Sequence, residues 1–235
     1  MVHISQLILG DTGCVSYIVL CKEKRECAIV DSFEDYEEDI HEEIKRLSFP
    51  TVKYVIETHT HADRNSASNY FASEFGLEGI VKSEMTKYKG KKITTKDGDI
   101  LKIGNAKLKV IYTPGHTYDH NCYLVEDNLL SGDCLFIGDV GRIDLGGDLR
   151  EKTEMLYNSL RKLENLPANT KIYPNHVGAI HAIDSEDKFS TISKEMKNNE
   201  ALQVKDVKEF HTYMTEGWPP KPDNWEEIVK YNLVG

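Results

Sequence analysis

The chain has 235 residues, which is enough to bury one substantial hydrophobic core, and we expect a single α/β domain. Its 39 acidic side chains outnumber the 29 basic ones, giving a formal net charge of −10. This charge would repel a phosphate backbone or an anionic membrane, so we expect no nucleic acid and no membrane as partners. A small-molecule substrate is the better expectation.

The sequence carries no sign of export or of a membrane span. Its first residues have no basic segment followed by an apolar run, and no stretch approaches the roughly 18 apolar residues of a spanning helix. We therefore expect a cytoplasmic protein. The five cysteines are an odd number without a CxxC pair, and we expect them to be reduced packing residues.

Short β-branched runs open the chain, followed by a helical pattern and a second strand. Strands are expected at residues 6–9, 15–21 and 26–32. Residues 35–47 place apolar side chains at intervals of three or four among charges, which predicts a helix with one buried face. The strand at 52–57 ends directly before a histidine-rich loop.

The second half repeats the same order of strands, a loop with candidate ligands, further strands and a helix. A helix is expected at 65–75, then strands through 80–83, 97–104, 105–114, 121–127 and 128–133, a helix at 151–163 and a strand at 170–176. Residues 187–199 and 204–217 are predicted to form amphipathic helices. We therefore treat 1–235 as one domain, with 185–235 as a C-terminal helical extension packed on it through Trp218 and Trp225.

Four clusters of metal-ligand residue types each follow a predicted strand. They are His59-x-His61-x-Asp63, Gly115-His116-Thr117, Gly132-Asp133 and Pro174-Asn175-His176. Loops at one edge of a sheet can bring several lone-pair donors together without distorting the core. The alternative is that these histidines are surface residues or are satisfied within the core.

The motifs HTHAD, TPGHT, LLSGD and YPNH resemble, in this order and spacing, those of the metallo-β-lactamase superfamily. The resemblance spans residues 4–180 and implies a four-layer αββα sandwich with a metal site at one edge of two sheets. Within the superfamily the sequence is most similar to persulfide dioxygenases, also called sulfur dioxygenases, and next to glyoxalase II. GDVGRIDLGGD and the stretch EFHTYMTEGWPPKPDN carry that closer similarity.

Arg64 stands where two-metal members of the superfamily have a histidine that binds a second ion. A guanidinium has only hydrogen-bond donors and stays protonated, so it cannot bind a cation and adds positive charge where the second ion would lie. We therefore expect one metal ion per chain.

The resemblance implies that His59, His116 and Asp133 are the metal ligands. Two histidines and one carboxylate with open positions are typical of non-haem Fe(II) oxygenases, so Fe(II) is the expected cofactor. Zinc is the alternative, because a zinc-bound water is also a nucleophile near neutral pH.

His61 and His176 are the candidate catalytic side chains. His61 either binds the metal or hydrogen-bonds beside it, and both uses place an imidazole near the ion. His176 is expected to hydrogen-bond near the cleft. Asp63 and Arg64 are expected beside the metal without binding it, and Asp63 either pairs with Arg64 or orients a ligand.

Arg142 lies in the segment that resembles the dioxygenase family. It either holds its loop by pairing with Asp144 or binds the carboxylate of a carrier thiol such as glutathione. His120 and His181 either face the substrate or are solvent-exposed loop residues, and exposure is the expectation.

Three functions follow from these observations. The leading one is oxidation of a glutathione persulfide or another low-molecular-weight persulfide by O2 to sulfite and thiol. The second is metal-dependent thioester hydrolysis of the glyoxalase II kind, and the third is a non-catalytic scaffold or metal-dependent sensor. Because the family often forms dimers, a homodimer is one expected state.

Overall fold

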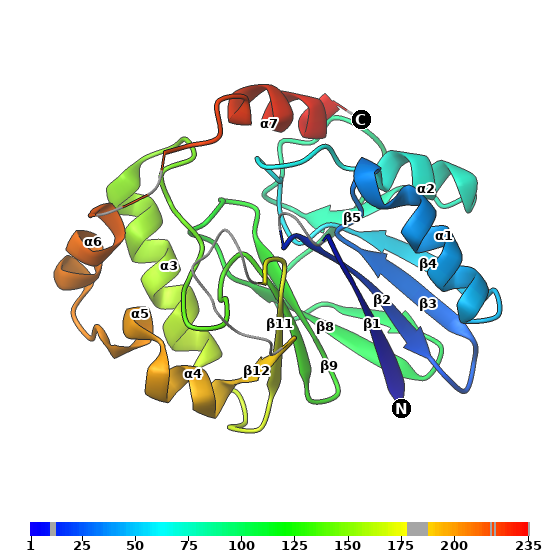
Figure 1. Ribbon diagram of the computed structural model, residues 1–235, viewed down its shortest axis with the longest axis horizontal. Coiled ribbons are helices and arrows are strands. Elements are labelled where there is room, and N and C mark those ends of the chain that lie inside the picture. The colour runs from blue at the N-terminus through cyan, green and yellow to red at the C-terminus, as the bar shows by residue number, and fades with distance from the viewer. Residues whose placement is uncertain (10–12, 178–187, 217, 219, 235) are drawn as a thin grey trace.

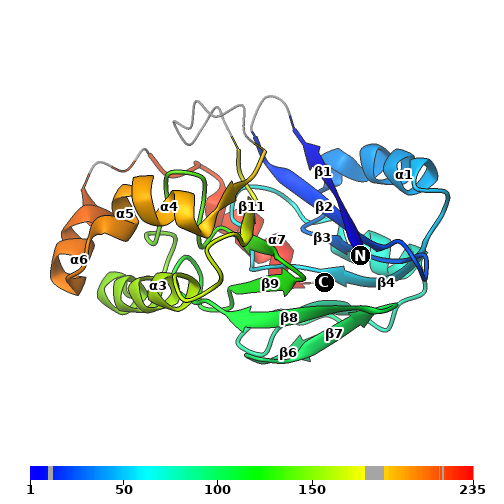
Figure 2. The same ribbon diagram turned by 90° about the horizontal axis from the view of Figure 1, so that it is seen from below.

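The computed structural model describes residues 1–9, 13–177, 188–216, 218 and 220–234. Within these residues two six-stranded sheets face each other, with strand orders β1-β2-β3-β4-β5-β6 and β12-β11-β10-β9-β8-β7. Helices cover the outer faces of both sheets, as Figures 1 and 2 show.

The first sheet is built from the beginning of the chain. Its strands are β1 (Val2–Ile8), β2 (Val15–Cys21), β3 (Glu26–Val30), β4 (Thr51–Ile56), β5 (Ile80–Ser83) and β6 (Lys92–Thr95). The 3₁₀ helix η1 (Glu34–Tyr36) and the helices α1 (Glu37–Arg46) and α2 (Ser68–Glu74) accompany it. Every residue of β2 is buried because both faces of this central strand are covered.

The second sheet takes its strands from the middle of the chain. They are β7 (Ile100–Ile103), β8 (Ala106–Tyr112), β9 (Asn121–Val125), β10 (Asn128–Gly132), β11 (Lys171–Pro174) and β12 (Ser190–Thr191). The helix α3 (Leu149–Leu163) begins at Asp148, whose side chain accepts a hydrogen bond from the N–H of Glu151.

Three separate hydrophobic clusters define the layers. One joins β2 and β3 to α1 and α2, with Ile29 and Ile40 among its buried residues. A second lies between the two sheets and includes Val19 and Val110. A third joins β10 and β11 to α3 and the C-terminal helices, with Leu160 and Phe210 among its buried residues. The four-layer αββα sandwich expected from the sequence is therefore confirmed.

The C-terminal segment differs in detail from the sequence expectation. Its helices are α4 (Ile192–Asn198), α5 (Glu200–Gln203), α6 (Val207–Thr215) and α7 (Trp225–Val234). The helix expected from residue 187 begins later, because residues 190 and 191 pair with β11 as the edge strand β12. The short helix α5 was not predicted from the sequence. No helix in the described part of the chain is long and apolar enough to cross a membrane.

Candidate metal centre

The loop after β4 begins where β3 and β4 end at the same edge of the first sheet. Asp31 comes directly after β3, which runs parallel to β4. Its Oδ1 accepts hydrogen bonds from the backbone N–H of Thr58 at 2.8 Å and from Nε2 of His61 at 2.9 Å. One carboxylate thus fastens both ends of the turn formed by residues 58–61.

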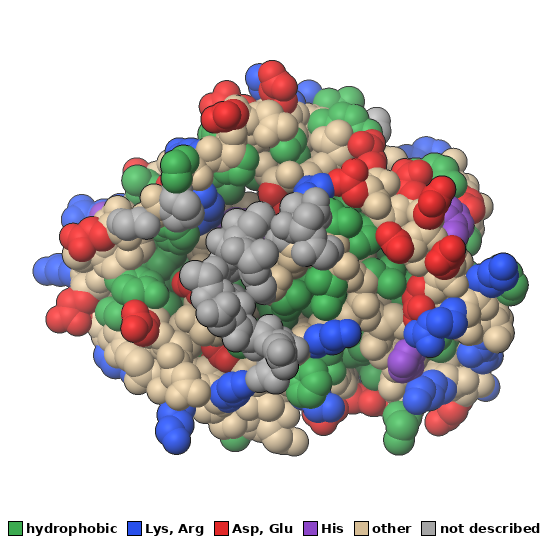
Figure 3. Space-filling model, in the orientation of Figure 1, with side chains coloured by type: hydrophobic (Ala, Val, Ile, Leu, Met, Phe, Trp, Pro, Cys, Tyr) green, Lys and Arg blue, Asp and Glu red, His purple; other side chains and the backbone are tan. Residues whose placement is uncertain are grey.

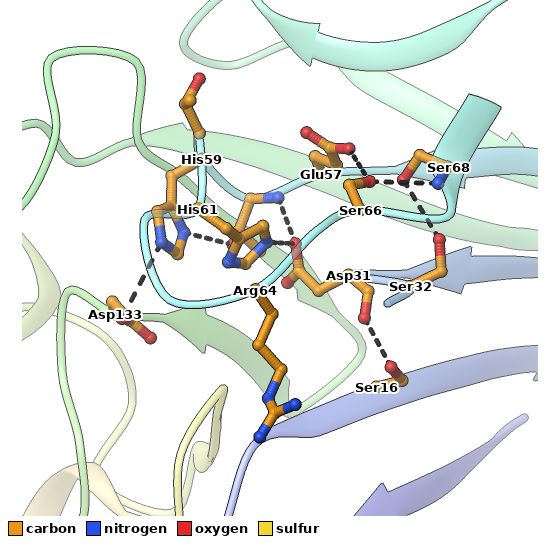
Figure 4. A network of polar contacts seen from close by, with 12 residues as sticks. Ser16, Asp31, Ser32, Glu57, His59, His61, Arg64, Ser66, Ser68 and Asp133 are labelled. Atoms are coloured by element: carbon orange, nitrogen blue, oxygen red, sulfur yellow. Dashed lines mark hydrogen bonds and ion pairs between the residues drawn. The ribbon is translucent and has the colours of Figure 1, made fainter. Parts of the chain in front are cut away.

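Three buried side chains from three different loops converge at this edge. Nε2 of His59 lies 3.8 Å from Oδ2 of Asp133, and Nε2 of His116 lies 3.5 Å from the same oxygen. The three donor atoms all lie within 4.8 Å of one another. Figure 4 shows His59 and Asp133 directed toward each other. These are the residues expected from the sequence to hold a metal ion.

Hydrogen bonds to the other ring nitrogens orient both histidines. Nδ1 of His116 lies 2.7 Å from the carbonyl oxygen of Arg142, and since a carbonyl only accepts, Nδ1 carries the proton. Nδ1 of His59 pairs with Oγ1 of Thr58 at 2.9 Å. Such bonds leave Nε2 of each ring for the centre, as in metal-ligating histidines generally.

The charge states of the three residues suit a cation. Burial holds the pKa of His59 well below its ordinary value and lowers the pKa of His116 to about 4. Burial alone would raise the pKa of Asp133, but the adjacent His176 holds it well below its ordinary value. At neutral pH the group is therefore two neutral imidazoles and one carboxylate, the protonation state in which these residues bind metals.

His61 lies beside His59, with ring centroids 4.1 Å apart, and is fully buried. Burial lowers the pKa of His61, but the Asp31 carboxylate outweighs this and raises it to about 9. Its Nδ1 has no hydrogen-bond partner among the described residues. A buried polar atom without a partner costs free energy, and a cation in contact with Nδ1 in place of its proton would remove that cost. The residues present therefore fit a divalent metal ion.

A second group of donor atoms comprises Cys14, Asp63 and His176. Oδ2 of Asp63 lies 3.0 Å from Nε2 of His176 and 3.5 Å from Sγ of Cys14, and Nδ1 of His176 lies 3.0 Å from Oδ1 of Asp133. Burial lowers the pKa of His176, but the Asp133 and Asp63 carboxylates raise it well above its ordinary value. The resulting imidazolium already neutralises two carboxylates.

Arg64 borders this second group and lies away from the first. Its guanidinium forms an ion pair with Asp35 and lies within reach of the Cys14 thiol. Figure 4 shows the Arg64 side chain extending away from His59 and His61. Asp63 therefore orients His176 instead of pairing with Arg64.

Negative charge explains the direction that Arg64 takes. Asp35 belongs to a group of acidic side chains from η1 and α1, which gather at one side of the face in Figure 3. This group contains Glu34, Asp35, Glu37, Glu38, Asp39 and Glu42. A guanidinium between this group and a buried imidazolium is drawn to the acidic side.

The family model described as the metallo-beta-lactamase superfamily matches residues 9–176, which include all four ligand clusters. The chain belongs to the metallo-β-lactamase superfamily.

Curated relatives and a solved structure extend this finding. A beta-lactamase hydrolase-like protein of Xylella fastidiosa is 28% identical over 198 residues, which cover 70% of this chain but only 44% of that protein. A hydroxyacylglutathione hydrolase of Pelagibacter ubique is 28% identical over 227 residues, covering 93% of this chain and 86% of the relative. The crystal structure of ETHE1 from Myxococcus xanthus superposes with a TM-score of 0.88 at 25% identity, covering 99% of this chain and 98% of that one.

His120 lies next to the donor group and contacts two of its three residues. Its Nε2 accepts a hydrogen bond from the backbone N–H of Asp133 at 3.0 Å, and its ring stacks on His59 at 5.2 Å between centroids. Gly132 has φ +53°, and a Cβ there would meet Nε2 of His120 at 2.5 Å. The expectation that His120 is exposed is therefore wrong: its side chain is completely buried and packs against His59 and the backbone of Asp133. His181 lies outside the described residues.

Arg142 forms a bidentate pair with Asp144, with Nε to Oδ1 at 2.6 Å and Nη2 to Oδ2 at 2.9 Å. Its Nη1 also donates to the carbonyl oxygen of Pro220 at 3.3 Å, and its guanidinium lies 5.3 Å from the Trp218 ring centroid. These contacts agree with the role of holding the loop. A substrate-binding role for Arg142 stays a prediction.

Sequence reasoning did not identify Asp31 or Asn232 as part of this region. Asp31 had a local signal, because it stands near the end of an expected strand, as the candidate ligands do. Asn232 had none, because its partners lie at residues 61–66, at the other end of the chain.

Proposed function

We propose that the protein is a mononuclear non-haem Fe(II) persulfide dioxygenase. The reaction is R–S–SH + O2 + H2O giving R–SH and sulfite with two protons, so the terminal sulfur is oxidised and O2 is reduced. The low-molecular-weight substrate we propose is glutathione persulfide. The observation that carries the proposal is the donor group of His59, His116 and Asp133, two imidazoles and one carboxylate within 4.8 Å.

The surroundings of the donor group support one ion in place of two. In the second group the His176 imidazolium lies between Asp63 and Asp133 and supplies the positive charge that a second cation would bring. The Arg64 guanidinium borders the same group through Cys14. Two fixed positive charges next to these donors disfavour a further cation.

Similarity over the whole chain also supports the proposal. The ETHE1 structure is matched over 99% of this chain, including the C-terminal helices, and this match is consistent with a persulfide dioxygenase. When bound, Fe(II) would supply the coordination positions at which the substrate sulfur and O2 are brought together.

Two residues of this chain have the chemistry to handle protons near the substrate. With its pKa raised to about 9, His61 holds a proton on both ring nitrogens, so it can donate a hydrogen bond to an entering persulfide anion or, after losing the Nδ1 proton, bind the ion. His176 holds a proton on each ring nitrogen between two carboxylates, which keeps the Asp133 carboxylate oriented toward His59 and His116. The stacked His120 ring and the hydrophobic clusters around the loops exclude water from this side.

Thioester hydrolysis is the second candidate, and one observation favours it. If His61 binds the ion through Nδ1, the centre has three histidines and one aspartate, and a zinc-bound water becomes the expected nucleophile. The similarity to hydroxyacylglutathione hydrolases agrees with this alternative.

Oxygen uptake separates the two functions. Protein loaded anaerobically with Fe(II) is given glutathione persulfide, and O2 consumption and sulfite are measured; the zinc-loaded protein is given S-lactoylglutathione. We expect stoichiometric O2 uptake and sulfite from the iron form, and loss of both in Asp133→Asn. Iron-bound protein that consumes no O2 above buffer, with turnover of S-lactoylglutathione by the zinc form, would refute the dioxygenase.

A further inference from the structure

One buried side chain of the last helix contacts the loop that carries His59 and His61. Asn232 lies in α7 and is 5% exposed. Its Nδ2 donates to the carbonyl oxygen of His61 at 3.0 Å and to that of Arg64 at 2.8 Å, and its Oδ1 accepts from the N–H of Ser66 at 2.9 Å. Figure 1 shows α7 lying above this part of the molecule.

The three bonds fix the orientation of the Asn232 amide. Carbonyl oxygens only accept and a backbone N–H only donates, so the NH2 group must face residues 61 and 64 while the oxygen faces residue 66. A carboxylate of the same shape could keep the bond to Ser66 but would place an oxygen against two carbonyl oxygens. An aliphatic side chain would leave these three backbone groups, one in a buried and two in part-buried bonds, without this partner.

Neighbouring residues hold α7 in place on both sides of Asn232. The hydroxyl of Tyr231 donates to Oε1 of Glu34, and the carbonyl oxygen of Leu233 accepts from the N–H of Lys89 at 2.9 Å. The Leu233 side chain packs against the cluster that joins the first sheet to its helices. Asn232 is therefore presented to the loop from a docked helix.

Between residues 61 and 66 the loop is also held by contacts of single side chains, among them Asp63 with His176 and Arg64 with Asp35. Its start is held by Asp31, and its end by the bridge between Phe33 and Ser66. The intervening residues form no helix or strand. Backbone groups in such a segment need side-chain partners where water does not reach them, and Asn232 bonds three backbone groups, of which the His61 carbonyl is buried.

We propose that Asn232 is a positioning residue for the metal centre, which links the C-terminal helix to the alignment of the histidine loop. By fixing the His61 and Arg64 carbonyls, it sets where the imidazoles of residues 59 and 61 lie before a cation binds. The helix that supplies it lies beyond the residues matched by the family model, 9–176. The inference holds whichever reaction the centre performs.

The test compares Asn232→Asp with its neighbour Tyr231→Phe, which removes a hydrogen bond of the same helix to Glu34 but leaves the three bonds of Asn232 to the loop in place. Metal affinity is measured by competition with a chromophoric chelator, using Fe(II) under anaerobic conditions and Zn(II). Loss of a partner that orients metal ligands typically weakens binding about 10- to 100-fold, and we expect this for Asn232→Asp. Tyr231→Phe is expected to bind as the unmodified protein does.

Two further measurements distinguish the positioning role of Asn232 from a general loss of stability. Ile40→Val, at a buried position of α1, should lower the melting temperature of the metal-free protein without changing metal affinity. Hydrogen exchange of the peptide covering residues 58–68 should accelerate in Asn232→Asp and stay unchanged in Ile40→Val. If Asn232→Asp does not fold, Asn232→Ala replaces it in both measurements. In that variant a water molecule can occupy the space of the deleted amide group.

An Asn232 variant that is folded and binds metal with unchanged affinity would overturn the positioning role. Equal weakening of metal binding in Ile40→Val at matched melting temperature would do so as well. Because neither measurement uses turnover, failure of the proposed dioxygenase reaction leaves this inference standing.

Discussion

His176 donates a hydrogen bond from Nδ1 to Oδ1 of Asp133 at 3.0 Å, while the other oxygen of Asp133 faces the imidazoles of His59 and His116. The carboxylate therefore cannot rotate without breaking a charge-assisted bond. One residue at the end of β11 thus sets the geometry of a donor at the end of β10.

Removing this bond should weaken metal binding without removing a ligand. His176→Gln is expected to lower the affinity for Fe(II) or Zn(II) by about 10- to 100-fold, because Asp133 loses the partner that orients it. The matched control is His41→Gln, which removes an imidazole from the surface pair with Glu74. Chelator competition measures both variants, and equal affinities would contradict the orienting role.

The metal content of three proteins tests the mononuclear proposal. We expect one ion per chain by elemental analysis after anaerobic purification and gel filtration, and two for Arg64→His, which adds a donor and removes a positive charge. Cys14→Ser should still contain one ion, because the thiol is not expected to bind metal. Two ions in the unmodified protein and one in Cys14→Ser would show instead that Cys14, Asp63 and His176 hold a second cation.

A buried ion pair supports the sheet edge next to the histidine loop. Lys82 and Glu57 pair where both are 2% exposed, and Glu57 also accepts a hydrogen bond from Ser66. Lys82→Met should lower the free energy of unfolding by about 3–5 kcal/mol, because it leaves a buried carboxylate without its cation.

The double substitution Glu57→Gln with Lys82→Met should lose less than Lys82→Met alone, since no unpaired charge remains. Lys96→Met is the control, because Lys96 and Glu84 form an exposed pair at 3.8 Å that contributes at most about 1 kcal/mol. Urea unfolding measures the free energy of unfolding of Lys82→Met, of the double variant and of Lys96→Met. A loss under about 1 kcal/mol for Lys82→Met would contradict the expectation.

Because Lys152 is buried, we expect the free energy of unfolding to rise at alkaline pH. Burial lowers the pKa of this 1% exposed ammonium from 10.5 to about 8. Between these values the unfolded chain binds more protons than the folded one, so stability rises with pH there and the cost of burying the charge is fully present below pH 8.

Relative to Lys152→Met, the unmodified protein should gain about 2 kcal/mol in its free energy of unfolding between pH 7 and pH 10, given roughly 1.4 kcal/mol per pKa unit. Lys162→Met, at an exposed pair with Asp97, is the control and should show no comparable gain. Parallel urea titrations at the two pH values measure this difference, and a constant gap between the unmodified protein and Lys152→Met would refute it.

The elements of the sandwich could be predicted because local patterns encode them. The spacing of Ile40 and Ile44 among charges indicated α1, and a run of β-branched residues indicated β2. The edge strand β12 was missed because two residues carry no periodicity, and their strand conformation comes from pairing with β11.

That His59, His116 and Asp133 lie close together could also be predicted, since each follows a strand and strand ends meet at one edge. The partners of the residues at this site were harder to predict from the sequence. The pairing of Arg64 with Asp35 depends on where η1 places its acidic residues, and the burial of His120 depends on the backbone of Asp133.

Local periodicity and the order of the motifs thus determined the layers and the identity of the donor residues. Tertiary structure alone decided which partner each donor received, because a hydrogen bond depends on distance in space. Asn232 shows the physical reason: its three bonds join the last helix to residues 61–66, and no short-range pattern in the chain encodes a contact of that separation.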